Sequence, residues 1–170
     1  AELMWTAETF YPEDYDYTPF FDMFVGRKID LTQPRFKTKK QLRDYCQLVA
    51  GTAGRMINPI LAKEETPGRR KFADDLGIAM QLTTILKDLK TDPVRFRDYL
   101  PDEMTDKSTI DWAVVEKGEA SEAFQKIVDE IAEMAETRDR SAQSAIVEFP
   151  VEVRDSLDFS ISVYRGLLSK

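Results

Sequence analysis

The sequence predicts an all-α fold. Residues 70–92 and 121–139 both carry apolar side chains at the spacing of a helix, three or four residues apart. A third helix start is marked by Thr38 and Gln41, which form a capping box: each side chain satisfies a backbone N–H that the first helical turn leaves unpaired. No segment offers a convincing partner for a β-strand, so we expect the regular secondary structure to be helical.

The first two segments are interrupted by proline. Residues 1–34 are rich in aromatic side chains and contain Pro12, Pro19 and Pro34, which predicts short helical pieces joined by turns. The helix that starts at Thr38 should end at Pro59, because the residue before a proline avoids the helical conformation. Its middle, residues 50–54, is made of small residues. Each interior glycine there costs about 1 kcal/mol relative to alanine, so close packing or a ligand surface must compensate.

The later segments differ in how far their apolar residues extend around the helix. Residues 70–92 are apolar over most of the circumference, which predicts a buried helix. Residues 94–118 are expected to form a loop or short turns, and residues 121–139 an amphipathic helix. Residues 157–163 alternate between apolar and polar, the period of a strand. Because no partner strand is evident, we interpret them as a buried helix.

A polar stripe runs along the otherwise apolar segment 70–92. Gln81, Thr84, Asp88 and Asp92 fall within about 80° of arc, and Gly77 lies one turn earlier, where a missing side chain would leave space. The two carboxylates stand at i and i+4 and repel each other. A hard cation such as Mg²⁺, bound through oxygen atoms, would relieve this repulsion. The alternative is that the helix ends in solvent and both aspartates are surface charges.

The composition excludes several kinds of chemistry. The chain of 170 residues has no histidine and one cysteine, Cys46, so it cannot build a His-dependent nucleophile, a His-ligated metal site or a disulfide framework. The net charge of −7 and the lack of a dense basic cluster argue against nucleic acid as a partner. No apolar run is long enough to span a membrane, and the N-terminal residues lack the pattern of a signal peptide. We expect a cytoplasmic protein, with contact to a membrane surface left open.

Five strings resemble the squalene/phytoene synthase family, and its bacterial phytoene and dehydrosqualene synthases in particular. They are GRKIDLTQPRF at 26–36, YCQLVAGTAG at 45–54, LGIAMQLTTILKDLKTD at 76–92, RFRDYLP at 95–101 and VYRGLL at 163–168. The resemblance covers nearly the whole chain. The string at 76–92 is specific, because many of its positions match in order and not merely two aspartates.

The resemblance implies an all-α isoprenoid (terpenoid) synthase fold, of which residues 1–170 would be a single, partial, N-terminally shortened domain. It implies a Mg²⁺-dependent condensation of two prenyl diphosphates, farnesyl or geranylgeranyl, joined head to head into a C30 or C40 precursor of triterpenoids or carotenoids. NADPH would be needed only if the product is squalene. The oligomeric state and the substrate length are not implied.

Roles for single residues follow from the same resemblance. Asp88 and Asp92 match the second aspartate-rich motif and would hold Mg²⁺ against the diphosphate. Tyr45 matches a tyrosine near the reacting carbons, where its ring or hydroxyl would stabilise a carbocation. The positions that match substrate-binding residues are Val49, Ala53, Gly54, Gln81, Thr84, Arg97 and Tyr164.

Departures from the family pattern support a second hypothesis. Thr84 stands where the family has Asn, Phe96 replaces a Gly, Lys87 an Arg and Gln47 a Tyr, and the first aspartate-rich motif is missing from these residues. Thr84, Phe96 and the missing first motif favour the alternative function, a non-catalytic helical relative of the family that acts as a binding or assembly protein, with a protein or a lipid as its partner. A head-to-tail synthase or a terpene cyclase would share the metal chemistry, but it fits the 45–54 string poorly.

Overall fold

The computed structural model describes residues 9, 11, 13–32, 35–62, 64–91, 97–104 and 110–168, without the side chain of Arg97. The described residues are helical and contain no strand, as predicted. The longer helices are α2 (Thr18–Leu31), α3 (Lys39–Cys46), α4 (Thr52–Leu61), α5 (Pro67–Thr91), α8 (Glu122–Ala145) and α9 (Val151–Leu168). The shorter elements are η1 (Gln47–Gly51), η2 (Arg97–Tyr99), α7 (Trp112–Glu116) and η4 (Ile146–Glu148).

Helix α2 corrects the prediction of short pieces before residue 34. It is one continuous helix of 14 residues, and Pro19 lies in its first turn. A proline is tolerated there because the first N–H groups of a helix have no partner within it. The proline that was expected to break the segment therefore helps to start it.

The segment from Thr38 begins as predicted and ends later than predicted. Thr38 and Gln41 form both bonds of the capping box. A single π-helical stretch, η1, then joins α3 to α4, and α4 continues through Pro59 to Leu61. Pro59 cannot donate to the carbonyl of Arg55, four residues earlier. The hydroxyl of Tyr15 donates to that carbonyl instead, at 3.3 Å, which helps the helix to pass the proline.

The core is built around α5 and α8, which pack more extensively against each other than any other two elements of the described chain. Ser121 caps α8, and its side chain accepts a hydrogen bond from the backbone of Phe124. One cluster of buried apolar residues joins α3, α5 and α8, and a second joins α5, α8 and α9 around Phe72, Phe149 and Ile161. Helix α5 contributes to both, which explains why residues 70–92 are apolar on most sides.

Helix α9 is helical as interpreted, but it is not buried. Leu157 and Ile161 are buried, whereas Phe159 is 70% exposed and Val163 is 43% exposed. An alternating pattern on a helix places every second apolar residue on the opposite side, so only half of them can face the core. The strand-like alternation therefore marks a helix with one packed side and one exposed apolar side.

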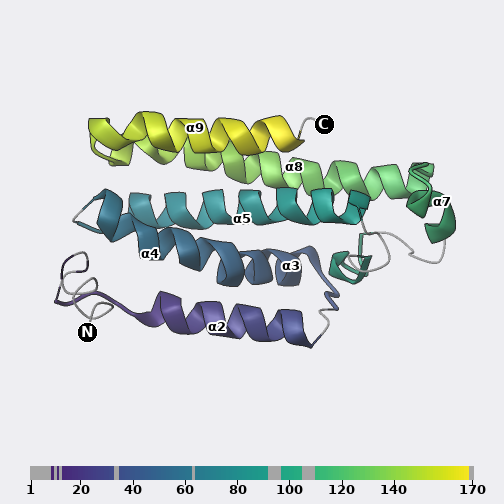
Figure 1. Ribbon diagram of the computed structural model, residues 1–170, viewed down its shortest axis with the longest axis horizontal. Helices are drawn as coiled ribbons and strands as arrows, with labels where there is room; N and C mark the ends of the chain where they lie inside the picture. The colour runs from purple at the N-terminus through teal and green to yellow at the C-terminus, as the bar shows by residue number, and fades with distance from the viewer. Residues whose placement is uncertain are drawn as a thin grey trace.

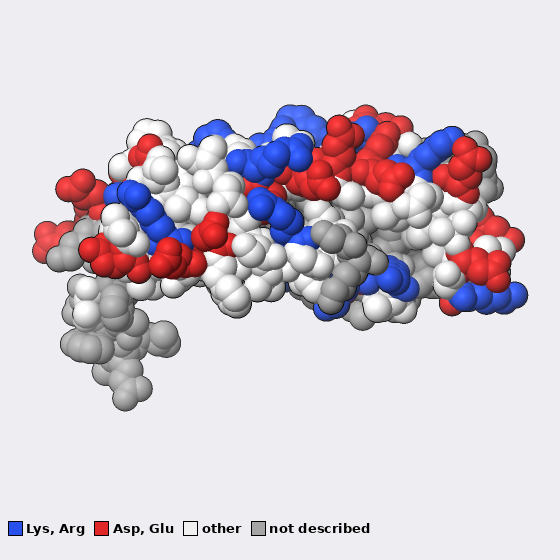
Figure 2. Space-filling view, turned by 90° about the horizontal axis from the view of Figure 1, so that it is seen from above, with Lys and Arg blue, Asp and Glu red and all other residues white. Residues whose placement is uncertain are grey.

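The helices are stacked in layers. Figure 1 shows α8 and α9 along one edge, α5 beside them, α4 and α3 next, and α2 along the opposite edge. Seen from the α8–α9 side, acidic and basic side chains are intermingled over the surface (Figure 2). Within the described part of the chain, no helix is both long and apolar enough to cross a membrane.

Candidate functional site

A largely apolar cavity of about 470 Å³ lies between α2, η1, α4, α5 and α9. Small and apolar residues of η1, α4 and α5 form most of its wall, and Arg27, Gln81 and Thr84 are among the polar residues that line it. A cavity of this size and composition is typical of small-molecule sites. Six residues that the family resemblance assigned to substrate binding line this one cavity: Val49, Ala53, Gly54, Gln81, Thr84 and Tyr164.

Glycines let the helices around this cavity approach closely. A Cβ atom on Gly77 would lie 2.5 Å from the backbone carbon of Ala50 and from the backbone nitrogen of Gly51. A Cβ atom on Gly54 would lie 3.0 Å from Ala73. Gly77 lines the cavity, but the expectation that its missing side chain leaves space is wrong at the Cβ position, because the backbone of η1 occupies that position. The cost of the interior glycines is offset by this close packing.

Asp88 lies one turn beyond Thr84 on α5 and is half-buried. The amide of Gln81, the hydroxyl of Thr84 and the carboxylate of Asp88 place oxygen donors along one side of the helix, the donor type that Mg²⁺ prefers. The hydroxyl of Thr84 donates to the carbonyl of Met80 at 2.9 Å and keeps its lone pairs for other partners. No group of three metal-ligating side chains occurs among the described residues, so Asp88 would need further ligands. Asp92 lies outside the described residues, as does Phe96.

Tyr45 is buried and does not line the cavity. Its hydroxyl donates to Oδ1 of Asp30 at 2.6 Å, and its ring lies 5.6 Å from the ring of Tyr99. Burial and the hydrogen bond to Asp30 raise the pKa of Tyr45, so its hydroxyl stays protonated. Arg97 begins η2, and its side chain is not among those described.

The sequence did not predict a role for two residues of α2 that lie at or near the cavity wall. Arg27 lines the cavity, and its Nη1 lies 3.5 Å from Oδ2 of Asp30. Both residues belong to the string at 26–36 that resembles the family, but the pattern assigns them no role. Their i, i+3 spacing places both side chains on one side of a continuous helix. This spacing would have indicated the pair if residues 18–31 had been predicted as one helix.

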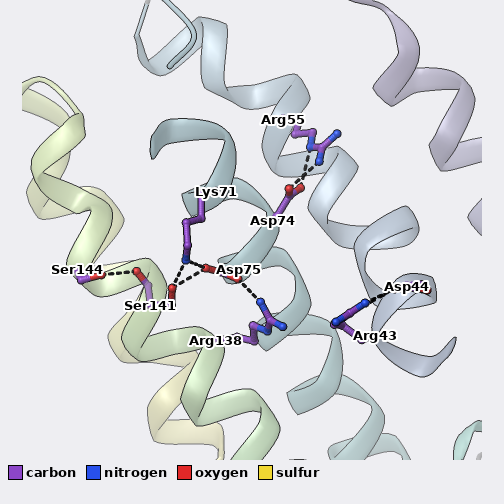
Figure 3. Close-up of polar contacts among 9 residues, drawn as sticks. All are labelled: Arg43, Asp44, Arg55, Lys71, Asp74, Asp75, Arg138, Ser141 and Ser144. Carbon is purple, nitrogen blue, oxygen red and sulfur yellow. Dashed lines mark hydrogen bonds and ion pairs between the residues drawn. The ribbon is translucent and has the colours of Figure 1, made fainter. Parts of the chain in front are cut away.

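The other side of α5 is closed by charged side chains rather than by a cavity wall. Figure 3 shows Asp75 between Lys71 of α5 and two residues of α8, Arg138 and Ser141. The carboxylate is 2.8 Å from Nη1 of Arg138 and 2.7 Å from Oγ of Ser141. Burial alone would raise the pKa of Asp75, but these hydrogen bonds outweigh burial and lower it.

The neighbouring Asp74 ties α5 to α4. Arg55 binds its carboxylate with two parallel contacts, Nε to Oδ1 at 2.7 Å and Nη2 to Oδ2 at 2.6 Å. Such paired contacts fix the relative orientation of both side chains. The adjacent carboxylates of Asp74 and Asp75 therefore hold α5 to two different helices.

The sequence model for the squalene/phytoene synthase family matches residues 1–170. The chain belongs to the squalene/phytoene synthase family. The 15-cis-phytoene synthase of Synechococcus elongatus is 42% identical over 99 residues, which cover 52% of this chain and 32% of that protein. The chloroplastic phytoene synthase of Daucus carota is 31% identical over 167 residues, 95% of this chain and 42% of that protein.

Solved structures of this family have the same fold. The squalene synthase HpnC of Alicyclobacillus acidocaldarius matches with a TM-score of 0.83 at 18% identity, over 98% of this chain and 62% of that one. A dehydrosqualene synthase solved in complex with a ligand matches with a TM-score of 0.78 at 29% identity, over 87% of this chain and 52% of that one. The isoprenoid synthase fold is thus confirmed. The chain spans less than half the length of the phytoene synthases it matches.

Proposed function

We propose that this chain carries a large part of the active site of an enzyme that condenses two prenyl diphosphates head to head, forming a carotenoid or triterpenoid precursor. The observation that carries this proposal is that six of the residues assigned by the resemblance line one apolar cavity. Asp88 does not line the cavity but lies one turn beyond Thr84 on α5. The phytoene synthase relatives support the same reaction class.

The residues around the cavity suit the chemistry of an allylic diphosphate. The apolar wall at Val49 and Ala53 would accommodate a prenyl chain and keep water away from a carbocation. Gln81 and Thr84 would orient the polar end of the substrate. The guanidinium of Arg97 would bind diphosphate oxygens with its planar pair of donors.

Mg²⁺ would be held by Asp88 and Asp92. When bound, it supplies Lewis-acid stabilisation of the negative charge that develops as the allylic C–O bond ionises. NADPH enters only if the product is squalene, and contact with a membrane surface would serve an apolar product.

The alternative, a non-catalytic relative that binds a protein or a lipid, is favoured by Thr84. Its hydroxyl hydrogen is already bonded to the carbonyl of Met80, and the side chain is shorter than the amide that the family has there. On this alternative the cavity would bind an apolar ligand without turning it over.

The test is Mg²⁺-dependent diphosphate release from farnesyl or geranylgeranyl diphosphate, measured on the full-length protein. Asp88→Asn should lower turnover by about 100-fold or more, since it removes charge from the metal site. The matched control is Asp129→Asn on the exposed side of α8, which should leave turnover unchanged. Wild-type turnover in Asp88→Asn would overturn the metal assignment, and binding without any diphosphate release by the unaltered protein would establish the alternative.

A further inference from the structure

The carboxylate of Asp30 joins two tyrosines that are far apart in the sequence. One oxygen, Oδ1, accepts the hydroxyl of Tyr45 at 2.6 Å and the hydroxyl of Tyr99 at 3.1 Å. The other oxygen, Oδ2, lies 3.5 Å from Nη1 of Arg27, which lines the apolar cavity. Asp30 therefore connects the cavity wall to α3 and to η2.

Simple burial of a tyrosine does not require this arrangement. A buried tyrosine hydroxyl needs one partner, and a backbone carbonyl or an ordered water would be enough. A carboxylate is a stronger acceptor, because hydrogen bonds to a charged group are shorter and stronger than neutral ones. Here one charged oxygen holds two hydroxyls, and their rings pack 5.6 Å apart with Phe36 beside both.

The second tyrosine belongs to a segment that is tied down at several points. The backbone N–H of Asp102 donates to the carbonyl of Phe36 at 2.9 Å, and that of Glu103 donates to the carbonyl of Lys37 at 3.1 Å. The side chain of Glu103 also accepts from the backbone of Lys39. Asp102 and Glu103 are thus fixed to residues 36–39, where α3 begins. Tyr99 adds the link to α2, two residues after Arg97.

We propose that Asp30 is a positioning residue for the reaction: it fixes the hydroxyl of Tyr45 relative to Arg27 of the cavity wall and holds η2, and with it the backbone of Arg97, in place relative to α2. The catalytic consequence rests on the proposed function. Loss of the carboxylate should affect two steps, because Tyr45 is assigned to the reacting carbons and Arg97 to the diphosphate.

Steady-state kinetics of the full-length protein with a prenyl diphosphate and Mg²⁺ separate the two effects. Tyr45→Phe should lower kcat, Tyr99→Phe should raise KM, and Asp30→Ala should do both, each by about tenfold, the equivalent of one charged hydrogen bond. Asp30→Asn keeps an oxygen acceptor and should recover most of both losses. If Asp30 only stabilised the fold, its substitution would lower the melting temperature, and the three substitutions would not affect kcat and KM separately.

A second measurement does not depend on activity. Cleavage by trypsin after Arg97 should become about tenfold faster in Asp30→Ala and Tyr99→Phe, and should stay at the wild-type rate in Tyr45→Phe and in the control Asp129→Asn. Unchanged cleavage and unchanged kinetics in Tyr99→Phe, which removes a single hydroxyl, would overturn the proposal even if Asp30→Ala failed to fold. If the unaltered protein released no diphosphate, the proposed function would fail, while the cleavage rates would still test the placement of η2.

Discussion

The two sides of helix α5 differ in the side chains that they present to their neighbours. Toward α4 and α9, it presents small and apolar side chains to a cavity of about 470 Å³. Toward α8, it presents Asp75, a nearly fully buried carboxylate held by two cations and a hydroxyl. The contacts of Asp75 with Arg138 and Ser141 join α5 to α8.

The largest expected effect comes from the tightest contact on the cavity side. Gly77→Ala places a Cβ atom 2.5 Å from the backbone of η1, so helix α5 or η1 must shift. We expect a loss of about 3 kcal/mol in the free energy of unfolding, measured by chemical denaturation.

The same substitution elsewhere provides a matched control. Gly166 lies on α9 with no atom within 4 Å of a Cβ at that position, so Gly166→Ala should stabilise the protein by about 0.5 kcal/mol through helix propensity. Equal effects of the two substitutions would show that close approach at Gly77 does not hold the cavity wall.

The α8 side should respond less strongly to the loss of its carboxylate. Asp75→Ala removes the shared partner of Lys71 and Arg138, and both cations are exposed enough to be partly hydrated afterwards. We expect a loss of about 2 kcal/mol. The exposed pair of Glu136 and Arg140, on the surface of α8, gives the comparison: Glu136→Ala should cost less than about 0.5 kcal/mol. Similar losses in both variants would mean that Asp75 behaves as an ordinary surface charge.

The smallest expected effect is the pH dependence that Asp75 gives to the free energy of unfolding. The pKa of Asp75 is lowered below its ordinary value of 3.8, so its ionised form stabilises the fold above about pH 4, and this contribution is lost as the pH falls through the folded-state value. The gap in unfolding free energy between wild type and Asp75→Asn should be constant near neutral pH and narrow below about pH 4. Asp16 and Asp44 also have lowered pKa values, but both proteins contain them, so they cancel in the difference.

Local signals in the sequence predicted much of this fold. The capping box at Thr38 depends on residues three apart, and the buried character of α5 depends on apolar residues within one segment, so both are visible without tertiary structure. The extent of α4 is not, because the carbonyl that Pro59 leaves unpaired is bonded by Tyr15, 40 residues before Arg55. The exposed side of α9 was missed because an alternating pattern does not state which half of its residues packs.

The residues of the candidate site also include some that the sequence predicted and some that it did not. Six residues named from strings typical of the family line one cavity, whereas other lining residues, such as Phe72 and Leu157, lie outside those strings. Asp30 and Asp75 have local partners at i−3 and i−4, but their bonds to partners 69 and 63 residues away leave no local signal in the sequence. A carboxylate that binds across such separations looks like any surface charge in the sequence.

The most direct test of the central claim is whether filling the cavity stops the reaction. Ala53→Phe places a large ring in the cavity wall, while Ala113→Phe places the same ring on the exposed side of α7. Turnover of farnesyl or geranylgeranyl diphosphate by the full-length, folded protein should fall by about tenfold or more in Ala53→Phe and stay within about twofold of wild type in Ala113→Phe. Wild-type turnover by Ala53→Phe would contradict the assignment of this cavity to the prenyl chain.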